Sequence, residues 1–324
     1  MLKRMLSSLV TIIVLSLTAF AADDAPAWLR QAASAPLPPY NKDTKAVVLH
    51  DESRITVNEN GQVTEVRQYA VKILSREAKD EAIALTIYNT DSEKVKEMRA
   101  WMIRPSGQVI KYGKDQTIDA IHEENDVYNE ARKRFISSED DVEPGAIFGY
   151  EVISENQTVF SQFGKGFQSD HPVVTSRLIL SLPDGWRVED KTFNHAKVEP
   201  QVVGSTYTWE LRNLSPIELE PASPSVTNLA ARVAISIFPP SGKSVAMRSF
   251  SSWKDVSQFV TELSDTQIEL NDAIASKARE LTASAKTEFE KIQAIGRYAQ
   301  AINYISIQIG TGRRRRRSSR CARR

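Results

Sequence analysis

The sequence predicts a mainly β protein: an antiparallel β-sandwich over residues 46–240, followed by an α-helical segment over residues 241–312. Short runs rich in β-branched residues recur along the first region, with Gly, Pro and Asn turn signals between them. After Pro239-Pro240 the hydrophobic period changes from two residues to 3.6. No helical pattern separates the strands, which disfavours a parallel α/β fold and leaves a closed barrel as the alternative.

The N-terminus predicts export. Lys3 and Arg4 precede an apolar run over residues 6–20, and the small residues Ala19 and Ala21 flank a cleavage point. These are the three parts of a secretory signal peptide, and the run is too short to favour a spanning helix. We therefore expect a signal peptide over residues 1–21, cleavage after Ala21, a periplasmic or secreted protein, and no stable membrane anchor once the signal is removed.

The next segment, residues 22–45, is rich in Ala and Pro and is predicted to be a linker. The strand pattern begins near Ala46. Asn58-Glu59-Asn60-Gly61 separates two runs rich in β-branched residues, and its Asn-Gly pair predicts a tight hairpin with positive φ at both turn positions.

The later strands are also predicted from runs of alternating hydrophobic and polar residues that begin and end at turn residues. Residues 113–129 are polar and give no clear pattern. Pro183-Asp184-Gly185 is a turn that leads towards Trp186 and Val188. The predicted strands cover residues 63–74, 82–88, 94–103, 108–112, 132–137, 146–154, 173–182, 198–203, 206–211 and 232–238.

Three amphipathic helices are predicted after residue 250. Ser252 can cap a helix that starts at Trp253, with Asp255 in the capping-box position. Together the helices look like the opening of a second domain. Their apolar stripes are Trp253, Val256, Phe259, Val260 and Leu263; then Leu270, Ile274, Ala278 and Leu281; then Phe289, Ile292, Ile295, Ala299 and Ile302.

The final segment, residues 313–324, is an Arg-rich tail without periodicity. We interpret it as a GC-rich gene translated out of frame. The alternative is a basic tail that binds an anionic membrane or nucleic acid, with an affinity that falls steeply with salt. Excluding this tail and the signal peptide, the chain carries 32 basic and 41 acidic residues. This acidic body has no basic stripe with interleaved aromatics, so we expect no nucleic-acid partner.

The sequence contains no recognisable catalytic or metal site. Its only cysteine, Cys321, excludes a disulfide framework and has no neighbouring histidine, so it is not expected to be a nucleophile. The histidines lack metal-ligand spacing. The acidic stretch His122-Glu123-Glu124 with Asp126 reads as a solvated loop, with weak Ca²⁺ binding as the alternative. Neither a nucleophile elbow nor a phosphate loop is present, so we expect no cofactor.

Aromatic residues offer the one candidate binding feature. Phe160, Phe163 and Phe167 lie around the Gly-rich stretch Phe163-Gly164-Lys165-Gly166-Phe167, which reads as a flexible binding loop. The tryptophans that follow strand patterns are expected to pack in the core instead. They are Trp101, Trp186 and Trp209.

The order of parts resembles exported bacterial proteins in which a β-rich domain of unknown function precedes a transglutaminase-like core of papain-type fold. The resemblance spans nearly the whole chain. It rests on the hairpin over residues 47–74, on residues 173–186 with their Leu-Pro-Asp-Gly-Trp turn, and on residues 289–309. The last of these contains the most specific motif, Tyr304-Ile305-Ser306-Ile307-Gln308-Ile309-Gly310.

The resemblance implies that the last helix and the following strand begin an α+β catalytic core. In the family, a Gly-Asp-Cys-Lys motif shortly downstream supplies the nucleophile, followed later by His and Asp. This chain departs from the pattern at Thr311 or Gly312, so no catalytic residue can be carried over. We therefore expect a truncated, non-catalytic portion of such a cysteine enzyme, whose intact relative performs acyl transfer or amide hydrolysis.

In that reading the β module positions a protein or cell-envelope substrate. The rival reading is a complete, non-catalytic periplasmic binding or scaffold protein. The rival predicts three C-terminal helices packed fully on the sheet, whereas a truncated core predicts an exposed apolar stripe along residues 289–302. The sequence does not predict the oligomeric state.

Overall fold

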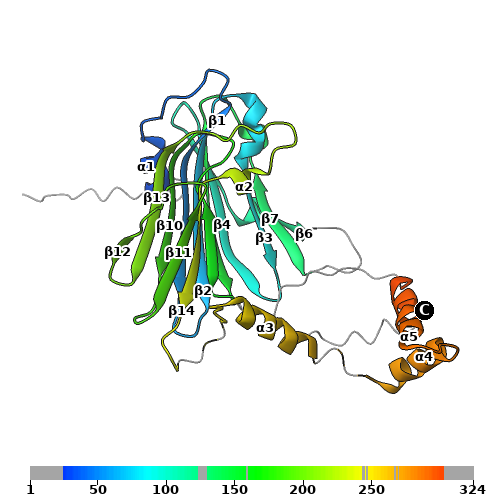
Figure 1. Ribbon diagram of the computed structural model, residues 1–324. Helices are drawn as coiled ribbons and strands as arrows, with labels where there is room; N and C mark the ends of the chain where they lie inside the picture. The colour runs from blue at the N-terminus through cyan, green and yellow to red at the C-terminus, as the bar shows by residue number, and fades with distance from the viewer. Residues whose placement is uncertain are drawn as a thin grey trace, which may run out of the picture.

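The computed structural model describes residues 25–122, 130–157, 160–242, 245, 247–265, 268 and 270–302 (Figure 1). The protein is mainly β, with several antiparallel sheets and helices at its C-terminal end, as predicted. The predicted signal peptide, most of the acidic stretch after His122, the motif at residues 304–310 and the Arg-rich tail with Cys321 lie outside the described residues. No helix of the described part is long and apolar enough to cross a membrane.

An eight-stranded sheet forms the centre of the fold, in the order β12-β13-β10-β1-β2-β8-β4-β5. Its pairs are antiparallel except β1 and β10, which run parallel, so the sheet is mixed at this one point. The strands are β1 (Ala46–Val57), β2 (Val63–Ile73), β4 (Glu93–Ile103), β5 (Val109–Tyr112), β8 (Ile147–Asn156), β10 (Val173–Ser181), β12 (Gln201–Val203) and β13 (Thr206–Leu214).

Two three-stranded sheets accompany it, in the orders β3-β7-β6 and β11-β14-β9. Two of their strands, β6 and β9, have no counterpart among the predicted strands because they are short and, in β9, rich in glycine. Strand β11 is indicated only by the turn that leads towards Val188. The bounds are β3 (Ile83–Asn89), β6 (Ile118–Ile121), β7 (Ala131–Ser137), β9 (Gln162–Gly166), β11 (Arg187–Phe193) and β14 (Arg232–Phe238). Short helical turns connect the strands: η1 (Arg76–Ala82), η2 (Lys114–Gln116), η3 (Glu139–Asp141) and α2 (Val226–Leu229).

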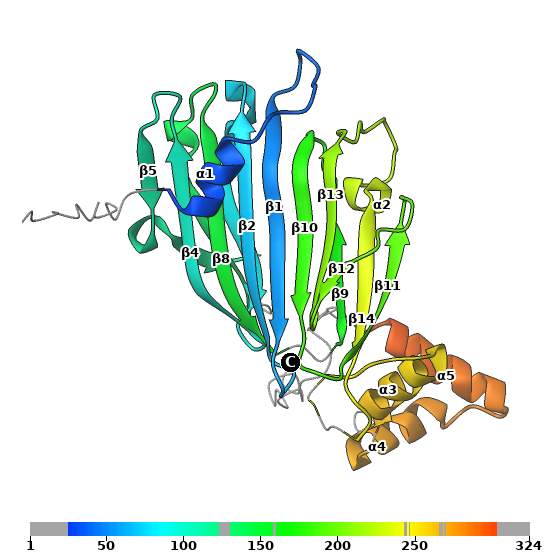
Figure 2. The same cartoon turned by 90° about the vertical axis from the view of Figure 1, so that its left-hand side faces the viewer.

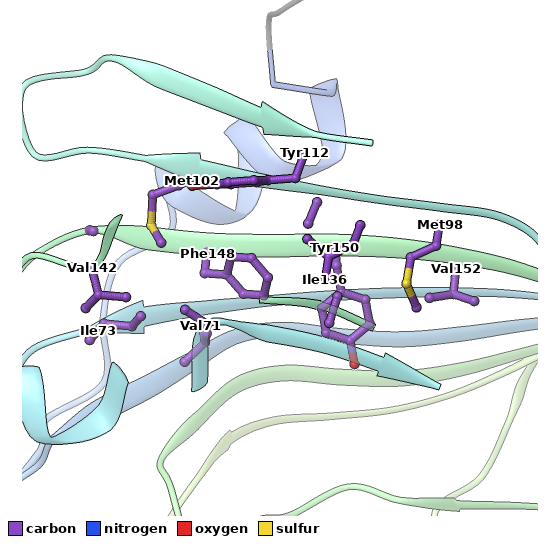
Figure 3. Packing of buried hydrophobic residues seen from close by; sticks show 14 of the residues in the cluster. Val71, Ile73, Met98, Met102, Tyr112, Ile136, Val142, Phe148, Tyr150 and Val152 are labelled. Atoms are coloured by element: carbon purple, nitrogen blue, oxygen red, sulfur yellow. The ribbon is translucent and has the colours of Figure 1, made fainter. Parts of the chain in front are cut away.

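Both small sheets pack on the same face of the large sheet, and each encloses its own hydrophobic core. The sheet β3-β7-β6 contributes Ala84 and Ile136 to the first core, which Figure 3 shows from close by. The sheet β11-β14-β9 contributes Val233 and Ile235 to the second. Burying a valine or isoleucine side chain in this way stabilises the fold by about 1.5–3 kcal/mol. The large sheet supplies Val71, Ile73, Met102, Phe148 and Val152 to the first core, and Ile55, Leu178, Leu180 and Trp209 to the second.

The opposite face of the large sheet carries α1 (Ala27–Ala33), which corrects the prediction of a linker over residues 22–45 (Figure 2). Leu29 is fully buried, in a third core with Val47, Leu49 and Ala70. The carbonyl of Pro26 accepts hydrogen bonds from the amides of Leu29 and Arg30 and so starts the helix. Seven residues make barely two turns, too few for a helical period to stand out from an Ala- and Pro-rich stretch.

The first hairpin is looser than predicted. Strand β1 ends at Val57 and strand β2 begins at Val63. The connection is therefore a five-residue loop rather than a two-residue turn. Of the Asn-Gly pair, only Gly61 has a positive φ, of 80°. The side chain of Asn58 stabilises this loop, because its Oδ1 accepts hydrogen bonds from the amides of Asn60 and Gln62.

Three helices end the described chain: α3 (Trp253–Asp265), α4 (Asp272–Thr282) and α5 (Glu288–Gln300). The predicted capping box of α3 is present, since Ser252 Oγ accepts from the amide of Asp255 while Asp255 Oδ2 accepts from the amide of Ser252. A second capping box, between Thr287 and Glu290, starts α5. Helices α4 and α5 pack against each other (Figures 1 and 2).

The apolar stripes of these helices are largely exposed. Within the described residues of the three helices, Phe259 is the one buried side chain. Trp253 is 87% exposed, Phe289 67% and Ile292 62%. The stripe predicted along residues 289–302 is therefore present and faces solvent.

Candidate functional site

The structure corrects the predicted aromatic binding loop. The segment is strand β9, paired with β14 from Gln162↔Ser236 to Gly166↔Arg232, and not a flexible loop. Phe167 is 1% exposed in the second core, and Phe163 is partly buried against it. Phe160 instead packs against Phe250 and Phe259, with ring centroids 6.1 and 6.2 Å away.

The three phenylalanines therefore do not share one open surface. Their contacts go in different directions, two of them into the sandwich and one towards α3. The predicted burial of the three strand tryptophans is confirmed, since Trp101, Trp186 and Trp209 are 3%, 6% and 0% exposed.

Polar side chains gather instead at the centre of the large sheet, on the face that the small sheets cover. Directly paired residues of neighbouring strands project from the same face. The register pairs Ser176 of β10 with Asp51 of β1, Asp51 with Tyr69 of β2, and Tyr69 with Tyr150 of β8. Arg67, two residues before Tyr69, projects from the same face. We call these five residues the central polar row.

The row separates the two cores. Tyr150 belongs to the first core, which extends across β8 and β4, and Tyr69 packs against that core. On the other side, Leu178 of β10 belongs to the second core and lies two residues beyond Ser176 on the same face. A polar strip inside a sandwich costs desolvation energy unless its groups find partners, so its partners indicate its role.

Lys165 of β9 reaches across the sandwich to this row. Its Nζ lies 2.6 Å from Asp51 Oδ1, and its side chain is 7% exposed. Burial lowers the pKa of Lys165, while the Asp51 carboxylate acts to raise it. The pair joins a small sheet to the large sheet, and removing one partner of such a buried pair costs about 3–5 kcal/mol.

The two tyrosines lie side by side, with ring centroids 5.4 Å apart. Burial raises the pKa of both Tyr69 and Tyr150, so both phenols keep their proton at neutral pH. Neither hydroxyl donates a hydrogen bond to a described residue. Each phenol therefore has a hydrogen-bond donor without a described acceptor.

Arg67 is the exposed member of the row. Its Cζ lies 5.9 Å from the centroid of the Tyr150 ring, and it forms no ion pair with a described residue. By contrast, His171 Nε2 lies 2.9 Å from Glu81 Oε1, and the hydrogen bond with Glu81 raises the pKa of His171. Among the described residues, Arg67 is thus a cation without a carboxylate partner, and Tyr69 and Tyr150 lie beside it.

The central polar row combines one cation with hydroxyl groups. It contains no thiol and no histidine, and its aliphatic hydroxyl, Ser176 Oγ, is fully buried. In the part of the chain that the structure describes, no group of His, Cys, Asp or Glu side chains is placed to hold a metal ion. The row can offer a positive charge and hydroxyl groups to an anionic or polar ligand.

Sequence reasoning missed the row, although a signal for it exists. Ile55 and Val57 are core residues of β1, and counting back in steps of two places Asp51 on the same face. The same count from Val71 of β2 places Tyr69 and Arg67 inward. Charged residues in the inward phase of a strand are uncommon, and this pattern is the available signal.

The outer face of the same strands also carries charges, but these are paired with one another. Glu52 is 3% exposed, with its carboxylate 2.8 Å from Arg54 Nη2 and 2.9 Å from Arg177 Nε. Farther along the face, Arg99 Nη2 lies 2.7 Å from Glu151 Oε1. The pairs Glu52–Arg177 and Arg99–Glu151 join neighbouring strands and stabilise the sheet, and Arg54 reaches Glu52 from the same strand.

Two cavities lie away from the central polar row. One, of about 820 Å³, lies between the Pro-rich segment at Pro36 to Tyr40 and the chain around Ser215 and Pro216. The other, of about 360 Å³, lies beside Phe250 and Phe259 at α3. Prolines dominate the lining of the first, and neither cavity contains a nucleophile with a base.

Comparisons with known proteins agree with this mainly β description. Residues 59–218 match the family DUF3857, described as a domain of unknown function with solved structure. A search of the curated proteins finds no match. A solved structure from Parabacteroides distasonis, described as a "putative protease", superposes with a TM-score of 0.62 at 14% identity, over 79% of this chain and 50% of that chain.

The likeness to the Parabacteroides protein shows a shared fold, and this chain spans about half of that protein's length. Yeast LTA4 hydrolase also matches, at 9% identity over 65% of this chain and 33% of that chain, but its TM-score of 0.31 supports no argument. The family match covers β2 to β13, including most of the central polar row. Residues 59–218, just under half of the chain, are therefore similar to the DUF3857 family.

Proposed function

We propose that this chain is the non-catalytic N-terminal portion of an exported transglutaminase-like cysteine enzyme, and that its β module positions a protein or cell-envelope substrate. The similarity of residues 59–218 to the DUF3857 family and the fold shared with the Parabacteroides distasonis protein support this proposal. The signal-peptide pattern over residues 1–21 supports export.

The observation that carries the proposal is the exposed apolar stripe of α5. Phe289 and Ile292 are more than 60% exposed, and Ile295 and Tyr298 are each 42% exposed. An amphipathic helix gains most of its stability by burying such a stripe. We propose that the stripe packs, in the intact relative, against the remainder of a transglutaminase-like core.

A complete periplasmic binding or scaffold protein is the second candidate. The central polar row favours it, because Arg67 and the two phenols offer a binding site that needs no catalytic core. The exposed helices argue against it, since this reading requires them to pack on the sheet.

The test uses the mature chain, from Ala22 onwards, in two assays. Co-sedimentation with purified peptidoglycan sacculi, and capture of envelope proteins on the immobilised chain, measure substrate holding. Amine incorporation into glutamine peptides and ammonia release measure catalysis. We expect binding without turnover. Turnover would overturn the non-catalytic assignment, and the absence of binding to every envelope fraction would overturn the substrate-holding role.

A further inference from the structure

We propose that the central polar row is a binding site for a peptide carboxylate, held by the Arg67 guanidinium and the hydroxyls of Tyr69 and Tyr150. This inference rests on the proposed substrate-holding role of the β module, and it names the chemical group that the module recognises.

The other cations near the central polar row have carboxylate partners. Lys165 is paired with Asp51 at 2.6 Å, and His171 is paired with Glu81 at 2.9 Å. Among the described residues Arg67 has no such carboxylate. A guanidinium loses solvation when it lies beside packed side chains, so an anion that binds it there gains more energy than at an open surface.

Arg67 lies in the middle of the large sheet, on strand β2 between β1 and β8. It is paired in register with Ser53 on one side and Val152 on the other, and both of these residues are buried. Arg67 itself is exposed. The two small sheets each cover their own core on this face, and Arg67 is an exposed residue of β2 between the strands of the two cores.

Hydroxyl groups near Arg67 lack hydrogen-bond partners among the described residues. The Tyr69 and Tyr150 hydroxyls are protonated and donate to no described residue. Ser176 Oγ, in the same row, is fully buried and has no hydrogen-bond partner in the described structure. Native proteins leave few buried polar atoms unsatisfied, and those that remain call for a partner.

The charges around Arg67 favour a carboxylate over a phosphate as the ligand group. The planar fork of a guanidinium matches the two oxygens of a carboxylate. Tyr150 has the largest raising effect on the pKa of Arg67, burial acts to lower it, and the carboxylates of Asp51 and Glu65 raise it further. These two carboxylates would repel the second negative charge of a phosphate more than the single charge of a carboxylate. Glu65 has no ion-pair partner among the described residues and can accept a hydrogen bond from a peptide amide.

The experiment titrates the mature chain with N-acetyl-alanyl-glutamate by calorimetry and by the NMR shifts of tyrosine ring protons. N-acetyl-alanyl-glutamine amide, which lacks both carboxylates, and inorganic phosphate are the comparison probes. The test variant is Arg67→Met, which keeps an unbranched apolar stem and removes the guanidinium. The control variant is Arg54→Met, on the opposite face of the neighbouring strand β1.

We expect binding of the acidic dipeptide to weaken about 10- to 100-fold in Arg67→Met and to change less than twofold in Arg54→Met. Tyr150→Phe should weaken it by about threefold to tenfold. Unchanged thermal melting of each variant establishes that the fold is retained. Arg67 is exposed and makes no ion pair within the described residues, so its replacement should leave the fold intact.

Equal binding of the amide probe, tighter binding of phosphate, or an undiminished affinity of Arg67→Met would each overturn the inference. Co-sedimentation with envelope fractions separates this failure from failure of the proposed function. If the wild-type chain and Arg67→Met sediment equally with sacculi or envelope proteins, the role stands and the assignment to Arg67 falls. If neither sediments, the role itself falls.

Discussion

The packing of α1 on the large sheet gives the most exact prediction, through the contact between Leu29 and Gly149. Gly149 lies in β8, on the α1 side of the sheet. A Cβ atom added there would lie 2.5 Å from Leu29 Cδ1 and 3.0 Å from Cδ2, closer than carbon atoms can approach. Leu29 is fully buried, so its side chain has little room to move away.

The expected energies follow from this geometry. Gly149→Ala should destabilise the protein by about 1–3 kcal/mol through overpacking. Leu29→Ala should cost about 2.7–5 kcal/mol through lost burial and the cavity left behind. The double variant should cost no more than Leu29→Ala alone, because the new methyl group occupies space that the leucine vacates. The two changes should therefore couple by about 1–3 kcal/mol.

Urea denaturation followed by tryptophan fluorescence measures these values. Trp28 of α1 lies 6.3 Å from Trp101 of the sheet, so the emission reports on α1 docking. The matched control is Gly166→Ala in β9, where an added Cβ meets nothing within 4 Å. It should change stability by less than about 0.5 kcal/mol. Additive penalties from the two α1 changes, or a harmless Gly149→Ala, would refute the docking of α1 on β8.

Three further predictions concern the sandwich and the helices. Lys165→Met should lower the free energy of unfolding by about 3–5 kcal/mol because it leaves Asp51 buried and unpaired, and adding Asp51→Leu should recover part of this loss in the same urea assay. Burial acts to raise the pKa of Asp119, but hydrogen bonds from Tyr88, Arg132 and Arg134 lower it overall. The stability from this carboxylate is therefore present above the unfolded-state pKa of about 3.9 and is lost as pH falls through the lower folded-state pKa. Asp119→Asn should reduce the loss of stability at acid pH in a curve of unfolding free energy against pH. An unchanged acid-pH loss in this variant would contradict the assignment. Replacing Phe289 and Ile292 by serine should reduce dye binding and aggregation while leaving the melting of the β module unchanged, whereas a loss of β-module stability would mean that α5 packs on the sheet.

Most strands of the fold could be predicted from the sequence, because their side chains alternate between a packed face and a more open one. Strand β10 is the clearest case: Ser176, Leu178 and Leu180 are buried while the residues between them are only partly buried. The three C-terminal helices were also predictable, from their 3.6-residue stripes and from the capping box at Ser252.

The elements that escaped prediction depend on partners far away in the chain. Strand β9 has two glycines and becomes a strand because β14, about seventy residues later, pairs with it. The parallel pairing of β1 with β10 brings together segments separated by most of the β module, which no local pattern encodes. Helix α1 forms on a sheet whose strands all follow it in the sequence.

The candidate site could not be predicted from the sequence for a related reason. Aromatic residues beside glycines suggested a flexible loop, yet Phe167 completes the second core and Lys165 reaches Asp51 across the sandwich. The central polar row is assembled from β1, β2, β8 and β10, whose order in the sheet differs from their order in the chain. The inward phase of Arg67 was visible in the sequence, but its neighbours were not.

The nucleotide sequence of the gene tests the central claim most directly. It should be read across the codons for Gly310 to Arg324 and onwards, in all three frames. The proposal that this is a portion of a transglutaminase-like cysteine enzyme predicts that another frame continues into a Gly-Asp-Cys motif and later His and Asp codons. If no frame continues in this way, the proposal is wrong, and the chain is a binding protein in its own right.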